Sequence, residues 1–432
     1  KIPNFSDIQK DTVQATLVSP FTGGKAMYPE RKASRVPMRL KTSLLMTLAA
    51  TGLVACGGGD GDPQEEIAKT CIETGAYACK TGETEPLYTF QWALNYAKSY
   101  FQSHADAGAF GGGIDLNVEP VHRQGIKGQG VNVLVLDSGV DLEHEDLKAN
   151  ADYSMSWNYV TGKNDPNPLL TNSRVAHGTN VAGMIAAAQN GKGVMGLAPL
   201  ARIGGGVMSF DSGRPISAEE WINYYGGAPW SRKAHVINAS YGAGMDAQEY
   251  DIDSSAELIG LNSLKSLRDG KGIVFVKSAG NSFDSQNVGD ERLNCGPLKG
   301  AYDCSNPADD VEALEPNVIV TAALNAKGQA SSYSSAGSVV WITGMGGEYA
   351  SNGKYGEVSG LSAAQIASGK TGDGPNIFST DIRGCSEGYS KTDTSPYPAN
   401  EFMHGLTSLI AGVKDNPNCD YSNMNGTSSA AP

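Results

Sequence analysis

Apolar residues in this chain come in short unbroken runs that alternate with segments of helical spacing. Residues 131–136 form one such continuous run, as buried parallel strands do. Further strands are predicted at 201–207, 234–240 and 272–279, and helices at 177–189 and 251–268. This alternation predicts an α/β fold with a doubly wound, mainly parallel sheet, whose functional site lies beyond the carboxyl ends of the strands.

Aromatic and aliphatic residues between 86 and 104 recur at the spacing of a helix. One stripe consists of Leu87, Phe90, Leu94, Ala97 and Phe101, and a second of Trp92, Tyr96 and Tyr100. We expect a helix here, packed on the main domain. Residues 57–65 and 108–113 are glycine-rich and indicate flexible stretches. We therefore divide the chain into an upstream segment with a signal peptide at 1–55, a tether with a helical extension at 56–113, and the main domain at 114–432.

Two features of the main domain depart from a plain alternation of strands and helices. Gly204, Gly205 and Gly206 interrupt a predicted strand, and the pattern offers no reason for them. Residues 345–375 and 381–424 are rich in Gly, Ser, Asn and Pro. Such composition predicts long surface loops.

The segment that begins at Met38 has the layout of an export signal. Arg39 and Lys41 supply a positive start, residues 43–53 are apolar, and Cys56 follows, ahead of a glycine run. This order looks like a bacterial lipoprotein signal, in which the cysteine is lipidated and becomes the mature N-terminus. An ordinary secretory peptide and a short buried helix are the alternatives. The apolar run is too short to span a membrane.

The chain holds seven cysteines, and lipidation of Cys56 would leave six. They lie as near neighbours: Cys71 and Cys79, Cys295 and Cys304, and Cys385 and Cys419. Because exported proteins form disulfides, we expect these three local pairs to be bridged. No cysteine or histidine spacing matches a zinc site, so we expect no metal ligands among them.

The net charge is −13, and no basic run with interleaved aromatic residues is present. So acidic a chain repels phosphate backbones, and we expect no nucleic-acid binding. Gly191, Gly193 and Gly196 match a dinucleotide pattern, but they follow a predicted helix where that site requires a strand. Residues 364–371 end in Gly-Lys-Thr without the first glycine of a phosphate loop. We expect no nucleotide at either segment.

Three residues supply the parts that acyl transfer from a peptide needs: a nucleophile, a base and a carboxylate that orients the base. Asp137 ends the apolar strand in Val-Leu-Val-Leu-Asp-Ser-Gly-Val-Asp. His177 begins a predicted helix in His-Gly-Thr-Asn-Val-Ala-Gly. Ser428 lies in Asn-Gly-Thr-Ser-Ser-Ala-Ala-Pro, where small residues allow a helix start to pack close to a substrate.

These three motifs, in the order Asp, His, Ser, resemble those of the subtilisin-like serine proteases. Further segments between His177 and Ser428 are similar to that family: 193–199, 236–242 and 278–281. The resemblance runs from about residue 120 to the last residue. It implies a three-layer subtilisin-like fold and a serine endopeptidase that acts on proteins or peptides.

The resemblance also implies roles for individual residues. Asp137 would orient His177, His177 would act as general base and then acid, and Ser428 would be the nucleophile. Asn281 and the backbone N–H of Ser428 would hold the oxyanion. The extended substrate backbone would pair with two segments that line its cleft: Ser240, Tyr241 and Gly242 on one side, and Ser278, Ala279 and Gly280 on the other. No cofactor is implied; structural calcium occurs in many such proteases, but no ligand set is visible here.

The sequence departs from the family pattern in two places. Ser429 stands where methionine is usual, although the register of the motif favours Ser428 as the nucleophile. The chain starts at Lys1 and stops at Pro432, inside a motif, so we expect a fragment that lacks most of the helix behind the nucleophile. A lipidated cysteine, a tether and long loops resemble the autotransporter subtilases of Gram-negative bacteria most closely. We therefore expect an exported protein, anchored by Cys56 at the outer membrane or cell surface or released to the medium.

Two other functions remain as alternatives. An esterase of the α/β-hydrolase class would place its Asp and His after the serine, whereas both precede Ser428 here. A lipid-anchored binding protein on an inactive protease scaffold would usually have lost a member of the triad, and all three are present.

Overall fold

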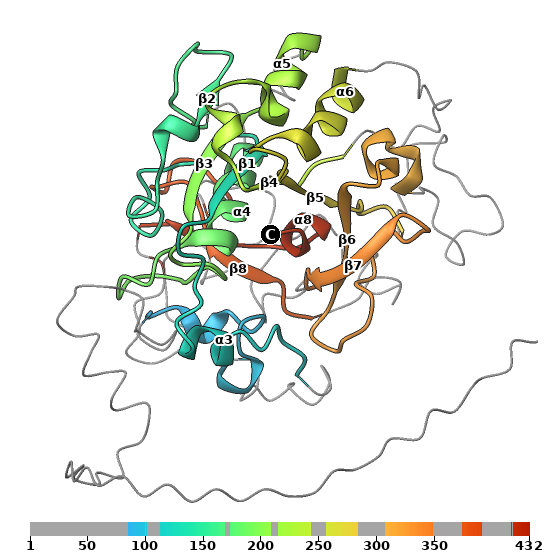
Figure 1. The fold of residues 1–432 in the computed structure, drawn as a ribbon. Coiled ribbons are helices and arrows are strands. Elements are labelled where there is room, and N and C mark those ends of the chain that lie inside the picture. The colour runs from blue at the N-terminus through green and yellow to red at the C-terminus, as the bar shows by residue number, and fades with distance from the viewer. Residues whose placement is uncertain are drawn as a thin grey trace, which may run out of the picture. The chain divides into compact units, whose positions relative to one another are not determined.

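A parallel sheet of seven strands lies at the centre of the part of the chain that the structure describes (Figure 1). The structure is a computed structural model, and it describes residues 85–99, 101, 113–168, 173–208, 215–242, 256–283, 307–348, 374–390, 416 and 418–432. The strand order is β2-β3-β1-β4-β5-β6-β7, and every pairing in this sheet is parallel. The strands are β1 (Asn132–Asp137), β2 (Trp157–Asn158), β3 (Arg202–Val207), β4 (Val236–Ala239), β5 (Val274–Ser278), β6 (Val318–Leu324) and β7 (Val340–Met345). The four strands expected from the apolar runs are confirmed.

Helices cover both faces of this sheet. They are α3 (Glu119–Arg123), α4 (His177–Ala186), α5 (Ala218–Ile222), α6 (Ala256–Ser263) and α8 (Thr427–Ala430). Alternate residues of β1 enter different cores, because successive side chains of a strand point to opposite faces. Val133 packs with residues of α4, whereas Leu134 packs with residues of α6. Figure 1 shows α5 and α6 on one side of the sheet and α4 and α8 on the other. The fold is therefore α/β with three layers, as expected.

Shorter turns connect these elements. The 3₁₀ turns are Tyr88–Phe90, Tyr96–Lys98, Tyr153–Met155, Ser173–Ala176, Ser231–Lys233, Leu264–Ser266, Pro307–Asp309 and Val311–Leu314, and a π turn spans Asn223–Gly227. The helix expected at 251–268 is present as α6, followed by one of these turns. In the part of the chain described, no helix has the length and the apolar composition needed to cross a membrane.

Over residues 86–99 the helix expected between 86 and 104 is wrong; residue 101 is helical, and residues 100 and 102–104 lie outside the described part of the chain. Two 3₁₀ turns take its place, and their side chains are bound by distant segments. The side-chain amide of Gln91 exchanges two hydrogen bonds with the backbone of Met195, and the indole of Trp92 donates to the Asn376 carbonyl at 2.7 Å. These tertiary contacts outweigh a weak helical preference, since aromatic residues are poor helix formers. Packing of the segment on the main domain is as expected, and the boundary at 114 stays a prediction.

The glycines of β3 have a steric reason that the sequence pattern could not show. A Cβ on Gly204 would lie 2.4 Å from the backbone oxygen of Met155, and one on Gly206 would lie 2.6 Å from Leu136 Cδ2. The strand itself is regular and pairs with β1 along its whole length. Glycine therefore lets the chain before β2 and the neighbouring strand approach β3 closely.

The surface loop expected at 381–424 is wrong in part. Residues Tyr421–Met424 form a buried strand, β9, which pairs antiparallel with β8 (Ile377–Thr380). A disulfide joins Cys385 to Cys419, with the two Cα atoms 5.0 Å apart, and confirms one of the three expected bridges. Polar composition misled the prediction because polar residues of this segment, such as Asn416 and Ser422, make hydrogen bonds inside the protein.

Several expectations fall outside the described residues. These are the signal and lipidation site at Cys56, the pairs Cys71–Cys79 and Cys295–Cys304, and most of the loop at 345–375. They remain predictions. All described residues belong to one unit, which spans 60–432.

Candidate active site

Asp137 and His177 form a hydrogen-bonded pair at the carboxyl edge of the sheet. Asp137 is the last residue of β1, and His177 is the first residue of α4. His177 Nδ1 lies 2.8 Å from Asp137 Oδ1 and 2.9 Å from Oδ2. Since a carboxylate only accepts, Nδ1 carries the proton and Nε2 is left to act as a base. The backbone N–H of Ser138 donates to Asp137 Oδ1 at 2.7 Å and holds the carboxylate in place.

The close approach of these two residues depends on Gly178. A Cβ there would lie 2.2 Å from the Gly139 oxygen and 2.8 Å from Asp137 Cβ. The start of α4 can therefore lie directly on the end of β1. Burial would lower the pKa of His177, but the adjacent Asp137 carboxylate outweighs burial and raises it.

Ser428 lies in the first turn of α8 and is buried, but its hydroxyl is not bonded to His177. Ser428 Oγ donates to the carbonyl of Ser240 at 3.0 Å. Ser240 Oγ in turn donates to the Ser428 carbonyl at 2.9 Å, and the side-chain amide of Asn238 donates to Ser240 Oγ. The structure thus brings Asp137 and His177 together and holds Ser428 on the end of β4.

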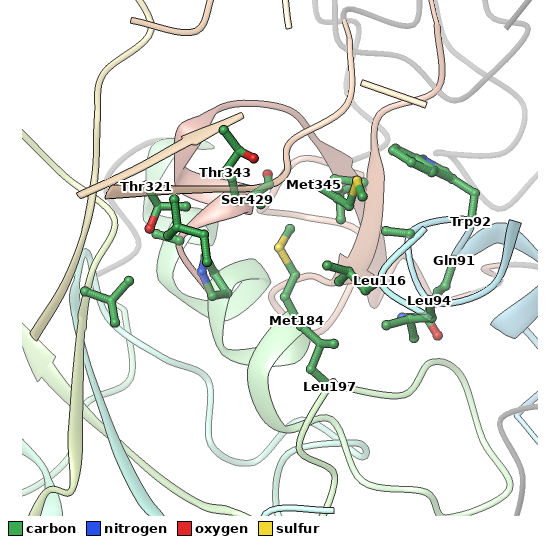
Figure 2. Close-up of a pocket in the computed structure, with 18 of the residues that line it drawn as sticks. Gln91, Trp92, Leu94, Leu116, Met184, Leu197, Thr321, Thr343, Met345 and Ser429 are labelled. Carbon is green, nitrogen blue, oxygen red and sulfur yellow. The ribbon is translucent and has the colours of Figure 1, made fainter. Parts of the chain in front are cut away.

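The neighbouring Ser429 lies in different surroundings. It lines an apolar cavity of about 320 Å³, and its buried hydroxyl has no hydrogen-bond partner among the described residues. Figure 2 shows Ser429 beside Thr343 and Met345, with Met184 projecting between them and the segment that carries Gln91 and Leu94. Ser428 does not line this cavity. The two serines thus lie in different surroundings, and the choice of Ser428 as the nucleophile stays a prediction.

Asn281 is held so that its amide nitrogen can donate. Its Oδ1 accepts from Thr427 N at 2.7 Å and from Thr427 Oγ1 at 2.9 Å. If residue 426 had a Cβ, that atom would lie 3.2 Å from Asn281 Nδ2 and 3.5 Å from Ser428 N. Glycine therefore keeps the space next to these two nitrogen atoms free of a side chain. It also adopts φ of 132°, which side chains disfavour.

The two segments expected to line a substrate cleft follow β4 and β5. Ser240 is buried, Tyr241 is half-buried and Gly242 is exposed. In the second segment Ser278 and Ala279 are buried, and Gly280 is half-buried with φ of 101°. These segments lie at the carboxyl ends of adjacent strands, where open α/β sheets bind ligands.

A set of polar contacts that holds α4 in place was not predicted from the sequence. Asn180 donates to the Thr380 carbonyl at 3.0 Å and to Ser422 Oγ at 2.9 Å. The hydroxyls of Ser379 and Thr380 donate to the carbonyls of Asn180 and Thr179. The signal that could have found them is the asparagine within an otherwise small and apolar helix face.

A buried lysine was missed as well. Lys277 belongs to β5, next to the segment 278–280, and is 1% exposed. The signal was visible as a lysine within the apolar run 272–279. A fully buried lysine needs paired charges around it.

Comparison with known proteins finds similar sequences and structures. A family model described as the subtilase family matches residues 128–432. The Aeromonas extracellular serine protease of Aeromonas sobria is 34% identical over 402 residues, which are 90% of this chain and 57% of that protein. The microbial serine proteinase of Aeromonas salmonicida is 28% identical over 331 residues, 74% of this chain and 46% of that protein.

Among solved structures, the complex of the Aeromonas sobria serine protease with a chaperone matches with a TM-score of 0.62 at 31% identity. The match covers 81% of this chain and 52% of that protease. The chain thus spans about half the length of the relatives that it matches.

Proposed function

This chain belongs to the subtilase family, and from that premise we propose that it is a serine endopeptidase that hydrolyses peptide bonds through an acyl-enzyme on Ser428. The observation that carries the proposal is the pair of Asp137 and His177, joined at 2.8 Å beside the turn that holds Ser428. A binding protein has no need of a buried carboxylate that fixes the tautomer of a histidine.

The reaction begins when a substrate carbonyl enters beside Ser428. The hydroxyl leaves the Ser240 carbonyl, gives its proton to His177 Nε2 and attacks the substrate carbon. Asp137 stabilises the imidazolium that forms, because its carboxylate holds the proton on Nδ1. The imidazolium then protonates the leaving amine. Water next attacks the acyl-enzyme while His177 takes its proton, and His177 returns that proton to Ser428 Oγ as the acyl group leaves.

The developing negative charge is met by two fixed donors. Asn281 Nδ2 and the backbone N–H of Ser428 both lie next to Gly426, whose missing side chain leaves them accessible to the substrate oxygen. Since Thr427 fixes Asn281 through its oxygen, the amide needs no reorganisation when the charge appears. The extended substrate backbone pairs with residues 240–242 and 278–280. The reaction requires no cofactor.

Labelling of the full-length protein with a fluorophosphonate probe tests the proposal. We expect one labelled residue, Ser428, and loss of labelling in Ser428→Ala and in His177→Ala. Peptide hydrolysis should fall by about 10⁶ in Ser428→Ala, because nucleophile and base act as a unit. A properly folded protein that reacts with no probe would favour the alternative of a binding scaffold.

We also propose that the protein is exported and carries a lipid on Cys56, which anchors it at the outer membrane or cell surface of a Gram-negative bacterium unless it is released to the medium. The order of charged start, apolar run and cysteine supports this. The name of the Aeromonas sobria relative, an extracellular protease, supports export. Export by an autotransporter route belongs to the same proposal.

Metabolic labelling with palmitate tests the anchor. The wild-type protein should incorporate the label and Cys56→Ser should not. Label that persists in Cys56→Ser would place the lipid on another residue, and a wild-type protein that takes up no label would favour an ordinary secretory peptide.

A further inference from the structure

The side chain of Lys277 ends in a closed polar cluster behind the segment 240–242. Its ammonium lies 2.6 Å from Glu312 Oε2 and 3.0 Å from Asp310 Oδ2. It also donates to the backbone carbonyl of Tyr241 at 3.0 Å and lies 4.6 Å from the centre of the Tyr241 ring. None of these contacts belongs to the proposed triad or the oxyanion site.

The cluster keeps this lysine charged. Burial would lower the pKa of Lys277, but Glu312 and Asp310 outweigh it and raise that pKa. Tyr225 donates to the second oxygen of Glu312 and is also bonded to the Tyr241 hydroxyl at 2.7 Å. Three parts of Tyr241 therefore contact the cluster: its backbone carbonyl and its ring contact Lys277, and its hydroxyl contacts Tyr225.

Lys277 determines the direction of one carbonyl in the cleft. The Tyr241 carbonyl accepts from Lys277 and from Ser278 Oγ at 3.2 Å, both at the end of β5. The preceding carbonyl, that of Ser240, accepts from Ser428 on the other side. In an extended chain, the carbonyls of successive residues point to opposite sides, and the backbone N–H and C=O groups of alternate residues point to the same side. The backbone groups of Ser240 and Gly242 are thus directed to the side of Ser428.

We propose that Lys277 is a positioning residue, which sets the backbone of Tyr241 so that Ser240 and Gly242 can pair with an extended peptide substrate. The proposal rests on the proposed peptidase function and adds a residue that no motif of the chain contains. Lys277 touches no reacting atom. It acts through Tyr241, and its loss should weaken the binding of long peptides without slowing the chemistry at Ser428.

The test compares two substrates that use different parts of the site. A fluorophosphonate reacts at Ser428 and needs no paired backbone, whereas an extended peptide needs both. Lys277→Met alone leaves Asp310 and Glu312 buried without their cation, and such loss strongly destabilises a protein. The informative variant is therefore Lys277→Met/Asp310→Asn/Glu312→Gln, which removes all three charges and keeps the side-chain volumes close to the originals.

A second buried lysine provides the matched control. Lys127 is 2% exposed, and its ammonium donates to Gln189. Both residues are distant in sequence from the segments 240–242 and 278–280. Lys127→Met in the full-length protein should lose stability without changing either reaction. Circular dichroism and thermal unfolding establish that each variant is folded.

We expect the fluorophosphonate to label the triple variant at the wild-type rate. For an extended peptide, KM should rise about tenfold while kcat changes little. A tenfold change is the size expected when one backbone hydrogen bond is misplaced. An unchanged KM would overturn the proposal. Equal losses of labelling and of peptide hydrolysis would overturn it too, because they indicate a general structural role. If the folded wild-type protein does not label at all, the proposed peptidase itself fails, and this result is distinct from the other two.

Discussion

At the scale of single residues, Asn281 offers the sharpest test of the site. Its oxygen is occupied by Thr427, so only its nitrogen can meet a developing charge. We predict that Asn281→Leu lowers kcat by about 10²–10³ with little change in KM, the magnitude measured for the loss of such a donor in subtilisin. Steady-state kinetics on a peptide substrate checks this. A rise in KM alone would make Asn281 a ground-state contact instead.

The pair of Asp137 and His177 predicts a pH effect. The Asp137 carboxylate favours the protonated imidazole and raises the pKa of His177, so the neutral base becomes available only as pH rises through that raised pKa. In Asp137→Asn the neighbouring negative charge is lost while His177 stays buried, so the pKa of His177 should fall. The acidic limb of the profile of kcat/KM should therefore move to lower pH.

The rate should change together with the profile. Replacement of this carboxylate costs a serine protease about 10⁴ in kcat, because the wrong tautomer of the histidine is then favoured. Kinetics from pH 4 to pH 9, a range of about five units around the ordinary value for histidine, would show both effects. A lower rate with an unmoved limb would mean that another group titrates.

At the scale of elements, β8 and β9 hold the helix that carries His177. The disulfide between Cys385 and Cys419 closes a loop with a sequence separation of 34 residues next to this two-stranded sheet. By the chain-entropy model, Cys385→Ser/Cys419→Ser should lower the free energy of unfolding by about 3–4 kcal/mol. Denaturant unfolding measures the change.

The same variant tests the link from this sheet to the active site. Thr380 and Ser379 bond the first turn of α4, so looser strands should misplace His177 and lower kcat more than they change KM. Unchanged kcat in a less stable variant would show that the sheet holds its place without the bridge.

The glycines of β3 predict a graded pair of variants. A Cβ at 204 meets a backbone oxygen, which cannot move without the chain, whereas a Cβ at 206 meets the end of Leu136, which can rotate. Gly204→Ala should therefore cost about 2–3 kcal/mol and Gly206→Ala clearly less, both within the range for overpacked cores. Equal costs from denaturant unfolding would mean that the Met155 backbone yields as easily as a side chain.

At the scale of the whole molecule, the segment 85–99 belongs to the core of the domain. Trp92 is fully buried, packs in the cluster that contains Val133 and Val135, and donates to the Asn376 carbonyl. Trp92→Ala should lower the free energy of unfolding by about 3–5 kcal/mol. Trp341, which is 65% exposed, is the matched control, and Trp341→Ala should change it by less than about 0.5 kcal/mol. Similar values for the two would mean that the segment only lies on the surface.

Local order could be predicted from the sequence because its causes are local. Four central strands follow from mainly apolar runs, since a buried parallel strand is largely apolar on both faces. Asp137, His177, Ser428 and Asn281 could be named because each lies in a short motif whose neighbours shape the backbone around it. Gly178 and Gly426 are such neighbours: the structure shows that a Cβ at 178 would clash with the Gly139 oxygen, and that residue 426 adopts φ of 132°.

Contacts between distant segments were decided only by the tertiary structure. The turns at 88–98 replace a helix because Gln91 and Trp92 bind partners at 195 and 376, which no local pattern reveals. Lys277 is acceptable in a buried strand only because residues 310 and 312 bring two carboxylates to it. Ser428 is named by its motif, but its hydrogen bond to Ser240 depends on where β4 ends relative to α8. A motif specifies which residues are present, and the packing of the sheet specifies which of them meet.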